Sequence, residues 1–138
     1  MIYFVTMSVL HGDRHIAHCV SSDLHYGKGV AKQVKERFGQ MEVVGAQDCR
    51  VGSVAVSGSH RRLIFHLFTK DKYFLKPSLS SLERCLWKLR FQMEVLHAHE
   101  VQIPHLGCGL DRLKWADVLP LIKKVFNSSS ADVFVCTL

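Results

Sequence analysis

The stretch Val101-Gln-Ile-Pro-His-Leu-Gly-Cys-Gly-Leu-Asp-Arg-Leu-Lys-Trp115 combines a short apolar strand, a loop with two glycines and the start of a helix. Val101–Pro104 fits a buried strand, and Gly107 and Gly109 give the loop after it backbone freedom. From Trp115 onward, apolar residues recur at helical spacing. A strand that runs through a glycine loop into a helix is typical of open α/β sheets, where ligands bind at the carboxyl ends of the strands.

A second passage of the same kind lies nearer the start of the chain. The apolar run Ile16–Val20 predicts a buried strand, and polar residues follow it up to Asp23. Gly27 and Gly29 then precede residues 30–38, whose apolar positions repeat every four residues, so we expect an amphipathic helix there. Backbone N–H groups at such a helix start can bind phosphate. A tight turn with no ligand remains the alternative, because no complete dinucleotide-binding or Walker motif is present.

Strands and helices alternate along the rest of the chain. We expect a first strand over residues 1–10, and a hairpin of Val51–Val56 and Arg62–Phe68 across a turn at Ser57–His60. The buried stripe of a helix that opens at Pro77 is predicted to comprise Leu79, Leu82, Leu86, Leu89 and Met93.

A third helix and a final strand complete the predicted elements. The helix covers residues 115–126, with Trp115, Val118, Leu119, Ile122 and Phe126 on one face. Pro120 predicts either a kink or a helix that begins at that residue. The last strand is expected over Val133–Cys136, and the alternation as a whole predicts an α/β sheet covered on both faces.

Composition limits the class of protein. The chain has 138 residues, 48% of them hydrophobic, which fits one globular domain over residues 1–138. The 18 Lys and Arg residues outnumber the 12 acidic ones, and this net charge of +6 favours anionic partners. No apolar run approaches the roughly 20 residues of a membrane-spanning helix, and the first ten residues resemble a strand more than a signal peptide.

The cysteines and histidines suggest neither a disulfide framework nor a metal site. The five cysteines are odd in number and form no CxxC pair, and the nine histidines are scattered. We therefore expect reduced thiols and an intracellular protein, cytoplasmic or nuclear, without a metal or cofactor. Cys108 lies in the second glycine loop, but spacing places no histidine beside it, so we interpret it as a packing residue.

Two charged residues at predicted loop positions have an ordinary and a chemical interpretation. Lys70 ends a strand, where a lysine is usually solvated, yet a lysine in a shielded cleft can act as a nucleophile towards a sugar C1 carbon. Asp111 lies just before the third helix, where capping of the helix N-terminus is its simplest role.

Together these segments resemble the macro-domain family, and in particular its terminal ADP-ribose protein glycohydrolase branch. The resemblance runs from about residue 14 to the C-terminus, and the Gly-Cys-Gly-Leu-Asp-Arg-Leu block from Gly107 is its most specific part. It also rests on residues 16–23 and 27–31, and on Thr69-Lys70 and Lys76-Pro77. It implies a single macro domain, an α/β fold with a mixed central sheet sandwiched between helices.

The resemblance also implies a function and its residues. It implies that Lys70 attacks C1″ of the distal ribose and that Asp111 acts in acid–base steps. The implied reaction removes mono-ADP-ribosyl groups from acidic side chains, and the acetyl group from O-acetyl-ADP-ribose as an additional activity. ADP-ribose is then a ligand or product and no cofactor is needed. The implied ligand-binding residues are Ser21, Asp23, Gly27, Gly29, Val30, Thr69, Pro104, Leu106, Gly107, Cys108, Gly109 and Leu110.

The implied partners are ADP-ribose and ADP-ribosylated proteins, and we expect a monomer that does not enter a membrane. ADP-ribosylated nucleic acid is a further substrate that the basic surface leaves open, although direct nucleic-acid binding is disfavoured because few aromatic residues separate the basic ones. Two other functions remain as alternatives: a phosphatase for ADP-ribose 1″-phosphate, and a reader that binds ADP-ribose without turnover.

The chain departs from the family at one position. Members usually carry Gly-Asp-Leu or Gly-Asp-Ile after the first strand, where the aspartate binds the adenine amino group. Here that position falls near Thr6-Met7-Ser8, and Gly12-Asp13 comes only three residues before the strand at Ile16. We therefore expect Asp13, a backbone group or a neighbouring polar side chain to replace the aspartate.

Overall fold

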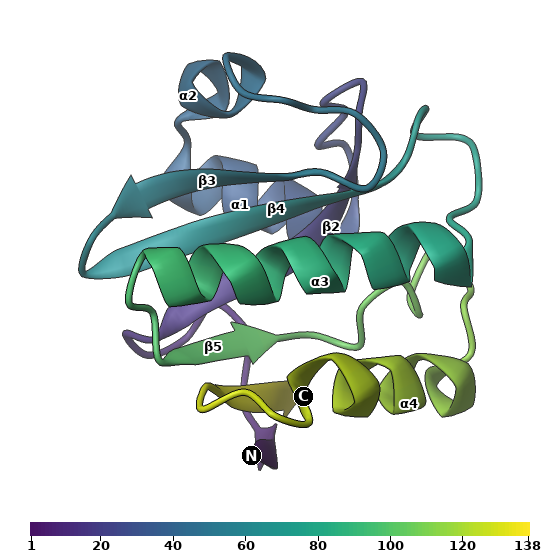
Figure 1. Ribbon diagram of the computed structural model, residues 1–138. Coiled ribbons are helices and arrows are strands. Elements are labelled where there is room, and N and C mark those ends of the chain that lie inside the picture. Colours follow the sequence, from purple (N-terminus) through teal and green to yellow (C-terminus); the bar gives the residue numbers. More distant parts are fainter.

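A six-stranded sheet runs through the computed structural model, which describes residues 1–138 (Figure 1). Helices lie on both of its faces, as the sequence predicts. In chain order the elements are β1 Ile2–Thr6, β2 His15–Ser21, α1 Gly29–Phe38, α2 Met41–Gly45, β3 Val54–Ser59, β4 Arg62–Lys70, α3 Leu79–Val95, β5 Glu100–Ile103, α4 Trp115–Phe126 and β6 Asp132–Thr137.

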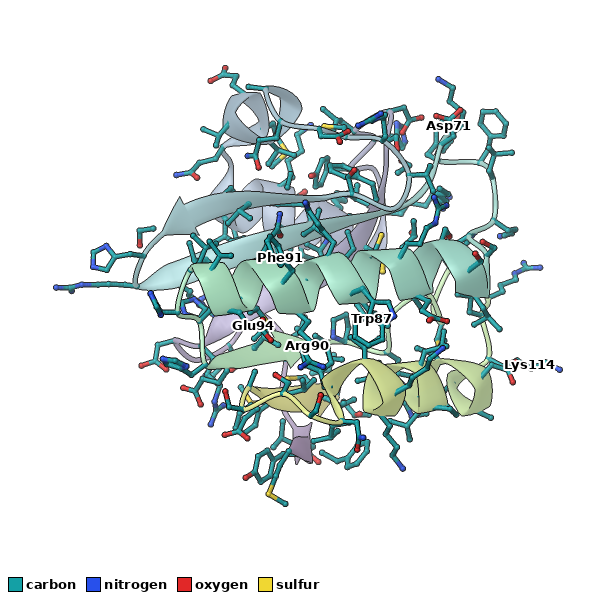
Figure 2. The ribbon with its side chains drawn as sticks, in the orientation of Figure 1. Asp71, Trp87, Arg90, Phe91, Glu94 and Lys114 are labelled. Carbon is teal, nitrogen blue, oxygen red and sulfur yellow. The ribbon has the colours of Figure 1, made fainter.

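The sheet is mixed, which confirms the predicted fold class. Its strand order is β1-β6-β5-β2-β4-β3, and only β3 runs antiparallel to its neighbour. The carboxyl ends of β2, β4 and β5 therefore lie at one edge of the sheet. This edge is on the right in both figures, where Figure 2 labels Asp71, which follows β4, and Lys114, which precedes α4.

Each face of the sheet has its own apolar core. Phe65 and Leu67 of β4 pack into the larger core, together with the buried residues of α3 and α4. Ile64 and Phe68, on either side of these residues in β4, pack on the opposite face of the sheet. There α1 and α2 contribute Val34 and Val44. Figure 1 shows α3 and α4 in front of the sheet and α1 behind it. Alternating strand residues supply both cores because successive side chains point to opposite faces.

Arg90 joins the two helices of the larger layer. Its guanidinium lies between α3 and α4 in Figure 2, and donates hydrogen bonds to the carbonyl oxygen of Val125 at 2.7 Å and to Oγ of Ser128 at 3.2 Å. The same side chain pairs with Glu94 one turn along α3 at 3.1 Å.

No helix of the structure combines the length and apolar character needed to span a membrane.

Several predicted boundaries near the strands were wrong. β1 ends at Thr6 rather than continuing to residue 10, because Ser8 begins a turn in which its carbonyl oxygen accepts the N–H of His11. The hairpin turns at residues 60–61 and not at 57–60, since Ser59 already pairs with Arg62. The short helix α2 was not predicted because five residues are too few to show a helical period.

Two predictions for the helices also need correction. Leu79 is the first residue of α3, directly after its cap Ser78, and remains 37% exposed, whereas Cys85 completes the buried stripe. α4 begins at Trp115 and continues through Pro120, so the helix does not start at the proline. The proline is the sixth of the twelve residues of α4 and is exposed, and its missing N–H removes one hydrogen bond within the helix.

The difference between Leu79 and Leu86 can be measured directly. Leu86 is 1% exposed within the larger core, so we expect Leu86→Ala to lower the free energy of unfolding by about 2–5 kcal/mol. Leu79→Ala on the same helix is the matched control and should change it by less than about 0.5 kcal/mol. Urea unfolding followed by circular dichroism measures both, and equal losses would contradict the assigned helix face.

Candidate functional site

A cavity of about 620 Å³ opens at the carboxyl edge of the sheet. Its wall is built from the loop after β2, the end of β4 with the segment that follows it, and the loop between β5 and α4. These are the two predicted glycine loops and the predicted lysine segment. They meet because parallel strands bring their carboxyl ends to one edge of an α/β sheet.

Lys70 and Asp111 form an ion pair in the cavity wall. The Lys70 Nζ donates to Oδ1 of Asp111, and the two side chains are only 13% and 18% exposed. Asp111 does not cap α4, because Lys114 occupies the cap position, so the simple capping interpretation was wrong. The two residues are 41 positions apart in the sequence, and the fold alone brings them together.

An irregularity between β2 and β4 places Lys70. The pairing shifts after Val20 and Phe68, so that Ser21 lies opposite Lys70 and Thr69 is passed over. Bulges of this kind change the direction in which a side chain points, and they are common beside active sites. The shift therefore puts the Ser21 and Lys70 positions side by side at the mouth of the cavity.

The two glycine loops face one another across the cavity. Gly29 has φ +62°, and a Cβ on it would lie 3.5 Å from Cδ1 of Leu110 in the opposite loop. At Gly107, φ is +71° and a Cβ would lie 2.7 Å from Cδ1 of Leu113, so a side chain there would meet both backbone strain and a clash. A ligand between the loops would contact main chain on both sides.

The start of α1 offers hydrogen-bond donors to this cavity. Its cap residue Lys28 makes no side-chain cap hydrogen bond, and no acidic residue lies in the first turn. Lys28, Gly29 and Val30 all line the cavity, so the free N–H groups of the first turn and a lysine are close to a ligand. Such an arrangement favours an anion, because the helix dipole adds positive potential.

Asp23 ties the cavity wall together from outside it. The Ser21 hydroxyl donates to its carboxylate, as do the backbone N–H groups of His25 at 3.3 Å and Tyr73 at 3.1 Å. Partial desolvation opposes ionisation of Asp23, but these donors outweigh it and lower the pKa of the carboxyl. The carboxylate thus connects the loop after β2 to the segment after β4. His25 and Tyr73 also stack, with ring centroids 3.9 Å apart.

Most of the residues proposed from the sequence line the cavity. Those in its wall are Ser21, Gly29, Val30, Lys70, Pro104, Leu106, Gly107, Gly109, Leu110 and Asp111. Asp23, Gly27, Thr69 and Cys108 lie outside the wall. Thr69 is 2% exposed, and burial raises the pKa of the Cys108 thiol, which agrees with a packing role. The contact of any of these residues with a ligand stays a prediction.

Further side chains that line the wall were not among the residues proposed to bind the ligand: Cys19, His25, Lys28, Tyr73, Phe74, Lys76 and His105. Of these, Cys19, Lys28, Lys76 and His105 lie within the motifs quoted from the sequence, whereas His25, Tyr73 and Phe74 lie outside them and were missed. The aromatic pair Tyr73-Phe74, directly after the lysine segment, was an available sequence signal for this part of the wall.

Burial raises the pKa of the Cys19 thiol well above its usual value, so this thiol stays protonated beside Asp111.

A second cavity of about 240 Å³ adjoins the first and shares Val30, Pro104 and His105 with it. Its polar side chains are neutral: Ser8, Gln33 and Thr137, with the His105 ring bonded to Oγ1 of Thr137 at 3.0 Å. Neither Asp13 nor any other acidic residue lines it. Asp13 therefore does not replace the missing aspartate in this cavity.

No group of three or more His, Cys, Asp or Glu side chains is arranged to hold a metal ion. The chemistry that the site can perform with its own residues is that of a shielded amine next to a carboxylate, in a cavity with an anion-binding wall. An amine–carboxylate pair can exchange a proton, after which the amine is a nucleophile.

Known proteins are similar to this chain in sequence and in fold. A family model described as Macro domain matches residues 17–122. The chain is 33% identical over 123 residues to the protein named ADP-ribose glycohydrolase OARD1 from Homo sapiens, an alignment that covers 89% of this chain and 81% of the human protein.

Solved structures agree in fold. The macrodomain of Mycobacterium tuberculosis DarG superimposes with a TM-score of 0.89 at 23% identity, covering 100% of this chain and 98% of that one. The macrodomain of Thermus aquaticus DarG gives a TM-score of 0.88, also at 23% identity, with coverage of 100% and 99%. The family match over most of the chain and the human relative confirm the resemblance: the chain belongs to the macro domain family.

Proposed function

We propose that the protein is an ADP-ribosyl hydrolase, which binds an ADP-ribosyl group in the joined cavities and releases it from an acidic side chain of a protein. The observation that carries this proposal is the Lys70–Asp111 ion pair in the wall of the larger cavity. The human relative named ADP-ribose glycohydrolase OARD1 supports the same reaction class.

We place each part of the ligand by the shape and charge of the site. The diphosphate lies between the two glycine loops, at the free N–H groups of α1 and near Lys28. The distal ribose lies next to Ser21, within reach of Lys70. The adenine occupies the second cavity, where Gln33 and Ser8 replace a carboxylate as hydrogen-bonding partners.

The ion pair supplies the chemistry. Asp111 accepts a proton from the Lys70 ammonium, and the neutral amine attacks C1″ of the distal ribose. The bond from C1″ to the acyl oxygen breaks, and the acidic side chain leaves as a carboxylate with the bonding electron pair. Water then attacks C1″, the bond from C1″ to the lysine nitrogen breaks with its electron pair going to that nitrogen, and a proton passes through Asp111 back to the amine, which releases ADP-ribose and restores the lysine.

The same cavity accommodates related esters. O-acetyl-ADP-ribose carries an acyl group on the same ribose, and when that group is on the C1″ oxygen the same displacement at C1″ releases acetate as a second reaction of this site. We take proteins as the modified partners, and ADP-ribosylated nucleic acid as the competing substrate to be tested. The five cysteines are all free thiols, which fits work inside a cell.

The roles of the two charged residues give the first test. We expect Lys70→Ala to slow single-turnover release of ADP-ribose from a glutamate-ADP-ribosylated protein by at least about a hundredfold, because covalent and acid–base steps contribute effects of this size. Asp111→Ala should slow it similarly, and both variants should still bind ADP-ribose in calorimetry. Lys72→Ala is the control, because Lys72 is an exposed lysine of the same segment outside the cavity wall.

Other outcomes identify the alternatives. Full activity of Lys70→Ala on the modified protein would overturn the lysine mechanism. Binding of ADP-ribose by the wild type without any release would indicate a reader. Release of phosphate from ADP-ribose 1″-phosphate that survives Lys70→Ala would indicate the phosphatase. Faster release from ADP-ribosylated DNA than from protein would reassign the partner.

The second cavity gives a separate test. Gln33 lines it, so Gln33→Ala should weaken ADP-ribose binding about 3- to 10-fold, the value of one hydrogen bond. Binding of ribose 5-phosphate, which has no base, should not change. Lys32→Ala in the same turn of α1 is the control, because Lys32 does not line the cavity. Equal weakening for both ligands would place the base elsewhere.

A further inference from the structure

Four polar side chains are buried together beside the loop that joins β2 to α1, and none of them lines either cavity. His66 of β4 is their centre. Its Nδ1 lies 2.9 Å from Nε2 of His18 in β2 and 2.9 Å from the hydroxyl of Tyr26, and its Nε2 lies 2.8 Å from Oγ of Ser57 in β3. All four residues are 5% exposed or less. The hydrolytic chemistry proposed above uses none of them.

The positions of the protons follow from counting donors. If His66 Nδ1 carries no proton, its single lone pair is shared by the Tyr26 hydroxyl and His18 Nε2–H, and His66 Nε2–H donates to Ser57. One acceptor, Nδ1 of His18, and one donor, the hydroxyl proton of Ser57, then have no partner among these residues. The opposite tautomer of His66 would let Ser57 donate, but it would leave two buried donors, the Tyr26 hydroxyl and the His18 Nδ1–H, without acceptors. Since unpaired buried donors are costly, the first arrangement is the more stable one.

Burial keeps the network neutral. Desolvation lowers the pKa of His18 to about 4 and lowers that of His66 further, while it raises the pKa of Tyr26. Both imidazoles and the phenol therefore remain uncharged at neutral pH. His66 stays an acceptor, and the Tyr26 hydroxyl keeps its proton to donate.

The loop that Tyr26 enters has few other attachments. The backbone N–H groups of Tyr26, Gly27 and Lys28 make no intramolecular hydrogen bond. The nearest backbone N–H before this segment that donates a hydrogen bond is that of His25, to the Asp23 carboxylate. After the segment, the N–H of Lys32 in α1 donates to the carbonyl oxygen of Lys28. The buried phenol is thus the anchor for a segment with unpaired N–H groups that leads into the cavity wall at Lys28 and Gly29.

We propose that Tyr26 is a positioning residue for ligand binding: its hydrogen bond to His66 fixes the segment that leads to Lys28 and Gly29, and so holds these two residues in the cavity wall where their N–H groups can bind the ligand's diphosphate. Ser57 and His18 orient the His66 ring that accepts this bond. A loop held in its binding conformation loses less conformational entropy when the ligand binds. This inference rests on the proposed function.

Tyr26→Phe tests the proposal, because it removes only the hydroxyl. The dissociation constant for ADP-ribose should rise about 3- to 10-fold, the value of one hydrogen bond, while kcat for ADP-ribosyl-glutamate release changes by less than about twofold. In the ligand-free protein, backbone order parameters from NMR relaxation should fall at residues 26–30 and stay unchanged in the core strands. Tyr3→Phe is the matched control, because its hydroxyl contacts only Met1 Sδ on the edge strand β1.

Each outcome separates this inference from the function on which it rests. Unchanged order parameters at residues 26–30, or a dissociation constant within twofold of the wild type, would overturn the positioning role. A fall of the order parameters throughout the molecule would also overturn it, since the effect would then not be local to the loop. If the wild type binds no ADP-ribose, the proposed function fails, and the order parameters of the ligand-free protein then decide whether Tyr26 anchors the loop.

Discussion

The parallel pairing of β2 with β4 is the constraint on which the rest of the structure depends. It brings the ends of two strands to one edge, and its shift after Val20 puts Ser21 opposite Lys70. The loop after β2 then leads into α1, and the segment after β4 forms the facing wall of the cavity. A regular pairing would have put Thr69 opposite Ser21, so one passed-over residue decides which side chain stands at that position.

The charge of the protein acts locally at this edge. Lys70 is neutralised by Asp111, whereas Lys28 and the free N–H groups of α1 have no acidic partner in the first helical turn. The site therefore separates a paired cation suited to proton transfer from an unpaired positive region suited to a diphosphate. The net charge of +6 alone could not have made this distinction, because most of the basic residues lie on exposed surfaces.

Neutral polar groups line the second cavity, which we propose for the adenine, where the family usually has a carboxylate. Ser8, Gln33 and Thr137 lie in this cavity, and the buried set around His66 lies beneath the loop that joins β2 to α1. Such groups cost less to desolvate than a carboxylate. In the network around His66, only the hydroxyl proton of Ser57 and Nδ1 of His18 have no partner.

The sequence by itself determined the alternation of strands and helices and the two glycine loops, because these depend on local patterns and short motifs. Lys70 and Asp111 were named together only through the resemblance to the macro-domain family, since local patterns favoured a solvated lysine and a helix cap. It failed where long-range packing decides: Leu79 has the right spacing but lies at the exposed end of α3, and Asp13 has the right chemistry but lines neither cavity. Only the tertiary structure paired Lys70 with a residue 41 positions away and joined His18, Tyr26, Ser57 and His66. Spacing along one chain cannot encode such contacts, because they depend on which strands become neighbours in the sheet.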